Sequence, residues 1–351
     1  MKLPAVFNSY NLVRQPLTIL LFCILVVYSC KKNSDASIID VYVAGFENSP
    51  SGFVGKYWKN GSPVNLGSNF SVANAITVSG DDVYVAGYEY QDGKPFSTVT
   101  YWKNGRAVNL SNGLKEANAE AIAVSGDDVY VAGSEKIDSI LIARYWKNGV
   151  AVNLSHGLWG ASANAIAVSG NDVYVVGNES DGTRVIAKYW KNGVSMDLNT
   201  DSSRVAYALD ICISGTDVYI AGLVENSAGF KTGIYWKNGI PVKVGDGINE
   251  TACQAITVSG NDVYVSGYQI LRYSVHSYGK YWKNGVGVDI GTDLRSSECR
   301  SIVVSGNDVY VAGEEHNGTH FVAKYWKNGV AVNLSDQSKN GFAYSIFITT
   351  H

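Results

Sequence analysis

The sequence has little charge and no excess of basic residues. Charged residues make up 17% of the 351 positions, and the formal net charge is −3. A protein that binds nucleic acid through its phosphates needs a basic surface, which this composition does not supply. Low charge together with 37 Gly and 23 Tyr favours an all-β fold over a helical one. We therefore expect an all-β protein with no nucleic-acid partner.

Cysteine is scarce as well, with 5 residues in the chain. Cys23 belongs to an apolar run near the N-terminus, and Cys30 follows that run. Cys212, Cys253 and Cys299 lie further along, where the other repeats carry mostly Ala or Val. We interpret these three as small buried side chains. A disulfide between Cys253 and Cys299, which occupy equivalent positions in neighbouring repeats, is the alternative.

Residues typical of catalysis do not come together in the sequence. Glu314, Glu315, His316 and His320 lie near one another, but without the fixed spacing of zinc ligands. No Gly-rich segment joins a strand to a helix, as phosphate binding requires, and no set of nucleophile, base and orienting residue stands out. We predict no catalytic residues, no metal and no cofactor.

The first thirty residues differ from the rest of the chain. Lys2 and Arg14 precede a mostly apolar run at 17–28. That run is too short to span a bilayer, which needs about 20 residues in a helix, but it fits the apolar region of a secretion signal. Val27-Tyr28-Ser29-Cys30 resembles a bacterial lipobox, whose Cys is lipidated. Ordinary signal cleavage or an uncleaved anchor are the alternatives.

These features predict three parts of the chain. Residues 1–29 are expected to be a signal peptide of the lipoprotein type, 30–37 a polar tether, and 38–351 the folded body. The protein would be exported and lipid-anchored through Cys30 to a bacterial outer membrane, facing the periplasm or the surface. We expect no other contact with the membrane, and a monomer.

The dominant feature of the sequence is Tyr-Trp-Lys-Asn-Gly, which occurs seven times. The copies begin at Tyr57, Tyr101, Tyr145, Tyr189, Tyr235, Tyr281 and Tyr325. Their spacing of 44 or 46 residues is typical of a repeat of one supersecondary unit. Asn-Gly between two apolar runs predicts a hairpin with a two-residue type I′ turn, because both residues adopt a positive φ at low cost.

Each repeat contains four strand-like runs. In the third repeat they cover 119–125, 128–133, 143–147 and 150–154. Near-invariant turns, Ser-Gly-Asp/Asn-Asp and Asn-Gly, follow the first and third runs, and we call their side of the molecule the constant face. The diverse loops that follow the second and fourth runs define the variable face. Four antiparallel strands in about 45 residues predict a propeller blade.

The two ends of the repeat array complement each other. Residues 40–45 match a second run with no clear first run before them, whereas 343–348, after the last repeat, match a first run. We therefore predict a seven-bladed β-propeller of four-stranded antiparallel blades, closed by the C-terminal strand, which completes the first blade. Pro63 and Pro241 place the fourth strand at the outer edge, because proline cannot donate to a ladder.

A charge pattern accompanies the hairpin of second and third runs. Gly133 ends the second run, and Glu135 follows it; Arg144 precedes the repeat Tyr, and similar residues recur in most repeats. Pairing Glu135 with Arg144 would set Trp146 opposite Gly133, which makes room for the indole. We expect cross-strand ion pairs at the Glu positions rather than a cation site, and packing tryptophans.

One ring of positions departs from the repeat pattern. It lies two residues before the repeat Ile of the first run and is mostly polar. Its members are Asn74, Glu120, Asn164, Leu209, Gln254, Arg300 and Tyr344. Because binding residues usually lie where a rigid scaffold is variable, we predict that all but Leu209 contact a ligand at the channel mouth of the variable face. A water-filled channel is the alternative. Trp159, in a variable loop, either contacts a sugar or covers the blade end.

The repeat resembles a known bacterial family. Tyr-Trp-Lys-Asn-Gly-x-x-Val-Asn-Leu, followed by Ala-x-Ala-Ile-x-Val-Ser-Gly, is similar to extracellular HAF-type repeats, which carry Trp-x-x-Gly-x-x-x-Asp-Leu. The resemblance covers about 40–351 and implies an exported propeller-like protein with no activity generally attached. Cys30-Lys31-Lys32 resembles the start of a Bacteroidetes-type lipoprotein. The Lys-Asn before the Gly departs from the family stretch.

Two classes of function follow. The first is a non-catalytic, envelope-anchored module that binds or scaffolds a protein or glycan ligand. The second is an envelope enzyme acting on glycans, a hydrolase or lyase, with its site at the channel mouth. Two carboxylates about 5–10 Å apart would favour the enzyme, whereas Glu120 as the only carboxylate at the mouth would favour binding.

Overall fold

The computed structural model describes residues 38–67, 70–198, 204–291 and 295–351. The predicted signal peptide and tether, with Cys30, lie outside the described residues. Within the described ranges the chain forms strands and turns, with no helix and hence no helix able to cross a membrane. The all-β prediction is confirmed.

Four kinds of strand recur along the chain. The first strands are β28 (Gly341–Thr350), β4 (Ser71–Ser79), β8 (Ala117–Ser125), β12 (Ala161–Ser169), β16 (Val205–Ser214), β20 (Glu250–Ser259) and β24 (Ser297–Ser305). The second strands are β1 (Ile39–Ser49), β5 (Asp82–Glu89), β9 (Asp128–Ile137), β13 (Asp172–Ser180), β17 (Asp217–Glu225), β21 (Asp262–Ile270) and β25 (Asp308–His316). The third strands are β2 (Gly52–Lys59), β6 (Thr98–Lys103), β10 (Ile140–Lys147), β14 (Val185–Lys191), β18 (Lys231–Lys237), β22 (Ser277–Lys283) and β26 (Phe321–Lys327). The fourth strands are β3 (Ser62–Leu66), β7 (Arg106–Asn109), β11 (Val150–Asn153), β15 (Val194–Asp197), β19 (Ile240–Lys243), β23 (Val286–Asp289) and β27 (Val330–Asn333).

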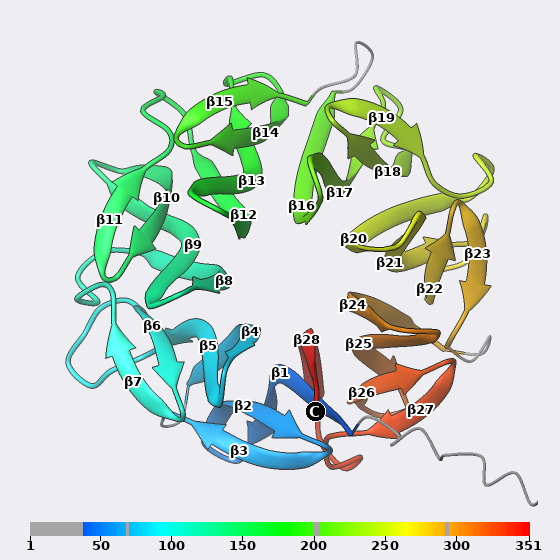
Figure 1. Cartoon of the computed structure of the whole chain (residues 1–351), viewed down its shortest axis with the longest axis horizontal. Helices are drawn as coiled ribbons and strands as arrows, with labels where there is room; N and C mark the ends of the chain where they lie inside the picture. The colour runs from blue at the N-terminus through cyan, green and yellow to red at the C-terminus, as the bar shows by residue number, and fades with distance from the viewer. Residues whose placement is uncertain (1–37, 68–69, 199–203, 292–294) are drawn as a thin grey trace, which may run out of the picture. The chain divides into compact units, whose positions relative to one another are not determined.

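These strands form antiparallel four-stranded units. Among the described residues, five sheets have four strands each, and a sixth has eight. The eight-stranded sheet consists of two such units joined by one parallel pair, Val185 and Val205. In Figure 1 the first strands lie toward the centre and the fourth strands at the periphery. Pro63 and Pro241 lie on the edge strands β3 and β19, as predicted.

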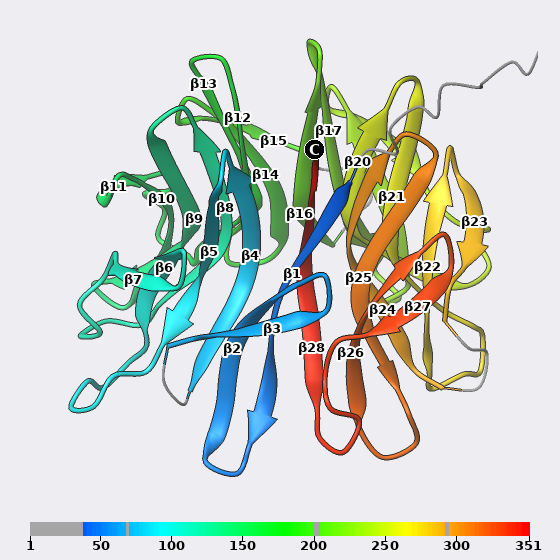
Figure 2. The ribbon, with the colours of Figure 1, turned by 60° about the horizontal axis from the view of Figure 1, so that its bottom comes forward.

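The sheet that contains the start of the described chain also contains its end. Its order is β28-β1-β2-β3, and β28 pairs with β1 from Ile39↔Thr350 to Glu47↔Gly341. Figure 2 shows these two strands side by side along the molecule. The C-terminal strand β28 is therefore the first strand of the unit that also contains β1, β2 and β3.

The Asn-Gly turns have the predicted conformation. Asn148 has φ 50° and Gly149 has φ 84°, and both residues have positive φ in all seven copies of the motif. This is the backbone of a type I′ turn, whose twist matches that of the flanking strands.

Side-chain bonds fix the same turn on the constant face. Asn148 Oδ1 accepts a hydrogen bond from the backbone N of Val129 at 2.9 Å, and its Nδ2 donates to Asp128 at 2.6 Å. Lys147 Nζ lies 2.7 Å from Asp128 and 5.1 Å from the centre of the Tyr130 ring. All seven units repeat this Asp–Lys pair. The invariant motif residues therefore have structural roles.

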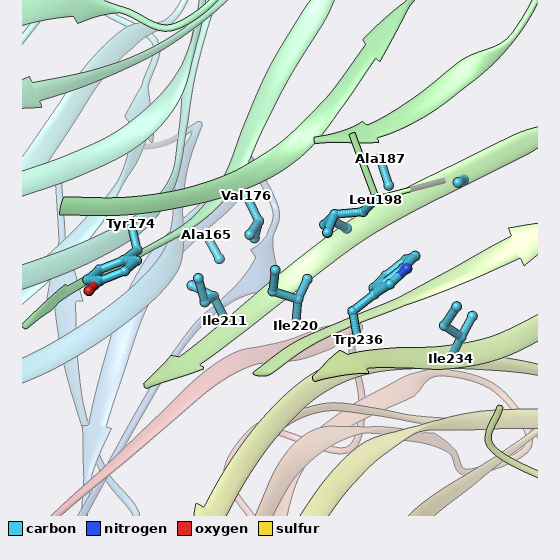
Figure 3. Packing of buried hydrophobic residues seen from close by; sticks show 11 residues of the cluster. Ala165, Tyr174, Val176, Ala187, Leu198, Ile211, Ile220, Ile234 and Trp236 are labelled. Carbon is cyan, nitrogen blue, oxygen red and sulfur yellow. The ribbon is translucent and has the colours of Figure 1, made fainter. Parts of the chain in front are cut away.

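The repeat tryptophans pack between neighbouring units. All seven are buried, with at most 3% of the surface exposed. Trp236 lies with Ile220 and Ile234 of its own unit and with Tyr174 and Val176 of the preceding one (Figure 3). Trp58 likewise packs with Tyr310 of β25. The prediction that these tryptophans are packing residues is confirmed.

The predicted register of the β9–β10 hairpin is wrong in one respect. Trp146 lies opposite Val131, and Gly133 lies opposite Arg144. The expected ion pair of Arg144 with Glu135 is present, but it forms diagonally, because these long side chains reach across two positions. Equivalent pairs are Glu47–Lys56, Glu179–Lys188 and Glu315–Lys324. At Gly133 the atoms nearest the Cβ position belong to β8, whereas at Gly222 the Trp236 ring also lies 2.9 Å from it.

The repeat glycine instead makes room for a β-bulge in the first strand. A Cβ on Gly133 would lie 2.0 Å from the carbonyl oxygen of Asn118 in β8. Equivalent carbonyls lie 1.9 Å from the Cβ position at Gly45, Gly87, Gly177, Gly222, Gly267 and Gly313. The first strand shifts register beside each glycine, as at Ala119 and Ala121. Glycine is needed for this close approach of two backbones.

We expect Gly133→Ala to destabilise the protein by about 3 kcal/mol or more, because the added methyl collides with backbone that cannot rotate away. Urea unfolding measures the loss. Gly160→Ala is the matched control, since its Cβ would meet only Leu141 Cβ at 3.8 Å. Equal stability of the two variants would contradict this account of the bulge.

Candidate functional site

Each bulge leaves one residue of the first strand without a partner opposite it. In β8, Ala119 pairs with Gly133 and Ala121 with Ala132, so Glu120 is skipped. The residues skipped in the seven units are Asn74, Glu120, Asn164, Leu209, Gln254, Arg300 and Tyr344. Bulges redirect side chains and are frequent next to functional sites. The ring singled out in the sequence is thus the ring of bulged residues.

All seven bulged residues line one cavity of about 850 Å³, which we call the central cavity. Its lining also includes Tyr90 and Ser97, beside the β5–β6 loop, and Glu116, just before β8. These positions place its opening on the variable face. The structure therefore brings together all six residues predicted to contact a ligand. Their role in binding stays a prediction.

Glu120 is held by amides on one side of the central cavity. Asn118 Nδ2 donates to Glu120 Oε1 at 2.6 Å, and Asn74 Nδ2 lies 3.5 Å from Oε2. The backbone N and hydroxyl of Ser134 fix Asn118 by donating to its Oδ1. Burial raises the pKa of Glu120 to about 7. Near neutral pH this carboxyl therefore exists in both the donating and the accepting form.

Arg300 occupies another part of the ring and is paired with two acids. Its Nε and Nη2 lie 2.9 and 2.6 Å from Glu314 Oε1, and Nη2 lies 2.9 Å from Glu298 Oε2. Burial disfavours its charge, but Glu314 and Glu298 hold the pKa of Arg300 above its ordinary value. Burial also raises the pKa of Glu314, and the guanidinium offsets part of that rise. Glu314, with 2% of its surface exposed, depends on this pair.

Aromatic rings form one wall of the cavity. Phe46 lies 5.8 Å from Tyr344 and 5.8 Å from Phe53, measured between ring centres, and Tyr88 lies 6.2 Å from Tyr90. All five line the cavity. Burial raises the pKa of Tyr344 to about 12. Such rings offer flat apolar faces beside polar hydroxyls.

The remaining bulged residues differ in what they offer a ligand. Asn164 Nδ2 donates to the carbonyl of Ala208 at 2.8 Å, and Asn74 Nδ2 donates to that of Ala119 at 2.8 Å. These amides join neighbouring first strands, so part of their role is structural. Gln254 lines the cavity, and Leu209 adds an apolar surface.

The sequence reasoning missed a second ring, formed by the residue after each repeat glycine. Phe46, Tyr88 and Ser134 of this ring line the cavity. Asn178 accepts a hydrogen bond from Asn164, and Glu314 pairs with Arg300. A signal was present, because this position also varies beside an invariant residue. In a regular strand successive side chains point to opposite faces of the sheet. On that basis the residue after the glycine would point away from the bulged residues, so the sequence did not predict the second ring.

Other residues singled out in the sequence lie away from the cavity. Trp159 does not line it and lies against Gly182 of the β13–β14 loop. Glu315 pairs with Lys324, and His316 Nδ1 accepts a hydrogen bond from Gly318. No three metal-ligating side chains gather among the described residues.

The cysteines of the described chain are free. Cys253 and Cys299 are buried, and Cys212 is half-buried. The interpretation of the first two as small buried side chains is confirmed. The alternative disulfide between Cys253 and Cys299 is wrong for this structure.

We expect Glu120→Gln to stabilise the protein in a pH-dependent way. The folded-state pKa of about 7 exceeds the ordinary value of 4.5, so native stability falls as pH rises through this window. Glutamine does not titrate, so the variant should exceed the wild type by about 1–3 kcal/mol near pH 8 and by little near pH 4. Urea unfolding at both pH values measures the difference. Glu116→Gln, exposed at the rim, is the control, and an equal gain at both pH values would count against the burial of Glu120.

Comparisons with known proteins bear on the fold of the chain. No protein-family model and no curated protein matches the chain. Among solved structures, an acylaminoacyl peptidase from Pyrococcus horikoshii matches with a TM-score of 0.54 and 13% identity, over 86% of this chain and 51% of its own. A puromycin-hydrolyzing peptidase from Mycobacterium tuberculosis matches with a TM-score of 0.54 and 11% identity, over 84% and 53%.

TolB from Acinetobacter baumannii also matches, with a TM-score of 0.50 and 10% identity, over 86% of this chain and 81% of its own. The chain thus spans about half the length of the two peptidases. At such identity the likeness shows the fold alone. Together with the repeated four-stranded sheets, it identifies a β-propeller fold.

Proposed function

We propose that this β-propeller is a non-catalytic binding module of a bacterial cell envelope that holds a glycan in the central cavity. One observation carries the proposal. Seven bulges direct seven mostly polar residues, of six different types, into a single cavity of about 850 Å³, in a protein that is otherwise repetitive. Fold alone does not define a task, but a concave site with convergent polar groups is the usual form of a ligand site.

The size and chemistry of the cavity favour a glycan over a folded protein partner. Ligand pockets measure about 300–1,000 Å³, whereas stable protein interfaces bury about 800 Å² on each partner, usually on flatter surfaces. Tyr88, Tyr90 and Phe46 offer ring faces, and Gln254 and Glu120 offer polar groups. Hydroxyl groups both donate and accept hydrogen bonds, so they suit amide and carboxyl partners.

The finer architecture is part of the proposal: seven blades in a closed ring. Support comes from the seven repeats, from the β28–β1 pairing, and from contacts of β28 with both β4 and β24. A ring leaves only short, protected sheet edges and holds the seven bulged residues around one axis. An experimental density map with β28 unpaired from β1 would contradict it.

The HAF-type resemblance and the lipobox support an envelope location. Cys30→Ala should then move the protein from the membrane fraction to the soluble fraction, because an acyl anchor stabilises membrane attachment by about 0.8 kcal/mol per buried CH₂. Fractionation and palmitate labelling of cells that express each form measure this. Cys23→Ala, in the apolar run, is the control and should keep the label. Membrane retention of Cys30→Ala would refute lipid anchoring.

A glycan array probed with the full-length protein in detergent tests binding. We expect hits whose affinity falls about 10-fold or more in Tyr88→Ala, because one aromatic contact is lost from the cavity wall. Tyr273→Ala is the control, since Tyr273 is 93% exposed and does not line the cavity. A protein that binds no glycan but captures a folded partner through another surface would overturn the glycan assignment.

The alternative is an enzyme acting on glycans. Its one supporting observation is Glu120, whose raised pKa suits a general acid near neutral pH. Two other acids near the ring have a pKa raised by burial, Glu314 and Asp210. Glu314 is bound by Arg300 and so is not available as a base or nucleophile, and Asp210 accepts a hydrogen bond from the backbone N of Ile256. Release of reducing sugar from an array hit, lost in Glu120→Gln, would establish the enzyme.

A further inference from the structure

The central cavity carries an excess of negative charge. Arg300 is the only base among its lining residues, and its guanidinium is taken by Glu298 and Glu314. Neither of these two acids lines the cavity, so the carboxyls of the lining itself are Glu120 and Glu116. Glu116, at the rim, is paired separately with Lys136 at 3.1 Å. A cavity of this kind attracts positive charge.

Glu120 is the carboxyl left for a ligand. Its contacts in the described chain are the neutral amides of Asn118 and Asn74, and no charged group contributes to its pKa. Glu298 and Glu314 by contrast are bound by Arg300. A buried carboxyl without a cation is costly when ionised. A ligand that brings the cation removes that cost.

Two phenol rings complete the surroundings of Glu120. Tyr88 and Tyr344 line the same cavity as Glu120. Burial raises the pKa of both tyrosines, and the charge of Glu120 adds to the rise in each. Tyr344 already accepts a cation, because the Arg300 guanidinium lies 5.3 Å from its ring centre. Rings and a carboxylate together are the usual surroundings of a bound ammonium group.

We infer that the ligand of the central cavity is a glycan with free amino groups, and that its ammonium binds Glu120 beside Tyr88 and Tyr344. This inference rests on the proposed glycan-binding function and names its ligand class. The amino group would donate to Glu120 Oε2, the oxygen that Asn118 leaves open and that Asn74 Nδ2 approaches only to 3.5 Å. Neighbouring sugar hydroxyls would lie against the aromatic wall and Gln254.

The test compares two oligosaccharides of equal length: β-1,4-linked glucosamine and its fully N-acetylated counterpart. Calorimetry with the full-length protein in detergent, at neutral pH, measures both affinities. We expect the free-amine form to bind at least about 10-fold more tightly, because a charge-assisted hydrogen bond is lost on acetylation. Glu120→Gln should remove the preference, and Glu225→Gln, which does not line the cavity, should keep it.

The possible outcomes distinguish the failure of the amine assignment from the failure of the proposed glycan-binding function. Equal or tighter binding of the N-acetylated form by the wild type leaves glycan binding intact and overturns the amine assignment. So does a preference that survives in Glu120→Gln. Binding of neither oligosaccharide, with hits only among neutral glycans of the array, also overturns the amine assignment alone. An array with no hit overturns both.

Discussion

The contact between each repeat glycine and the first-strand carbonyl is the constraint on which the rest of the molecule depends. With the Cβ position of Gly133 only 2.0 Å from the Asn118 oxygen, no other residue type fits without moving a backbone. That approach permits the bulge, and the bulge directs Glu120 into the cavity. One steric requirement, repeated in every unit, thus links the sheet geometry to the candidate site.

The two faces of the molecule divide structure from binding. On the constant face, Asp128, Lys147 and Asn148 bond one another and the neighbouring strand, and their equivalents do so in every unit. Because those bonds and the buried tryptophans fix each unit, the variable face and the bulged ring are free to differ. The residues that make the repeat recognisable are therefore not those that line the central cavity.

Sequence reasoning reached the bulged ring without knowing of the bulges, because departure from a repeat is visible in one chain. It missed the partners that give the ring its chemistry. Glu314 follows the repeat glycine Gly313, and Asn118 carries the carbonyl that contacts Gly133. Only the register shift in the first strand brings Glu314 beside Arg300 and Asn118 beside Glu120. The predicted Trp–Gly pairing failed for a different reason, because the charge pairs on which it relied form diagonally.

The sequence by itself determined the all-β class, the four-stranded unit, the type I′ turns and the outer position of β3 and β19. Each of these depends on local preferences: positive φ at Asn-Gly, alternation of side chains, and the missing donor of proline. Only the tertiary structure decided that Arg300 is neutralised by two acids while Glu120 keeps no cation. Charge pairing inside a cavity depends on side chains from different strands, and their distances are fixed only when the units pack.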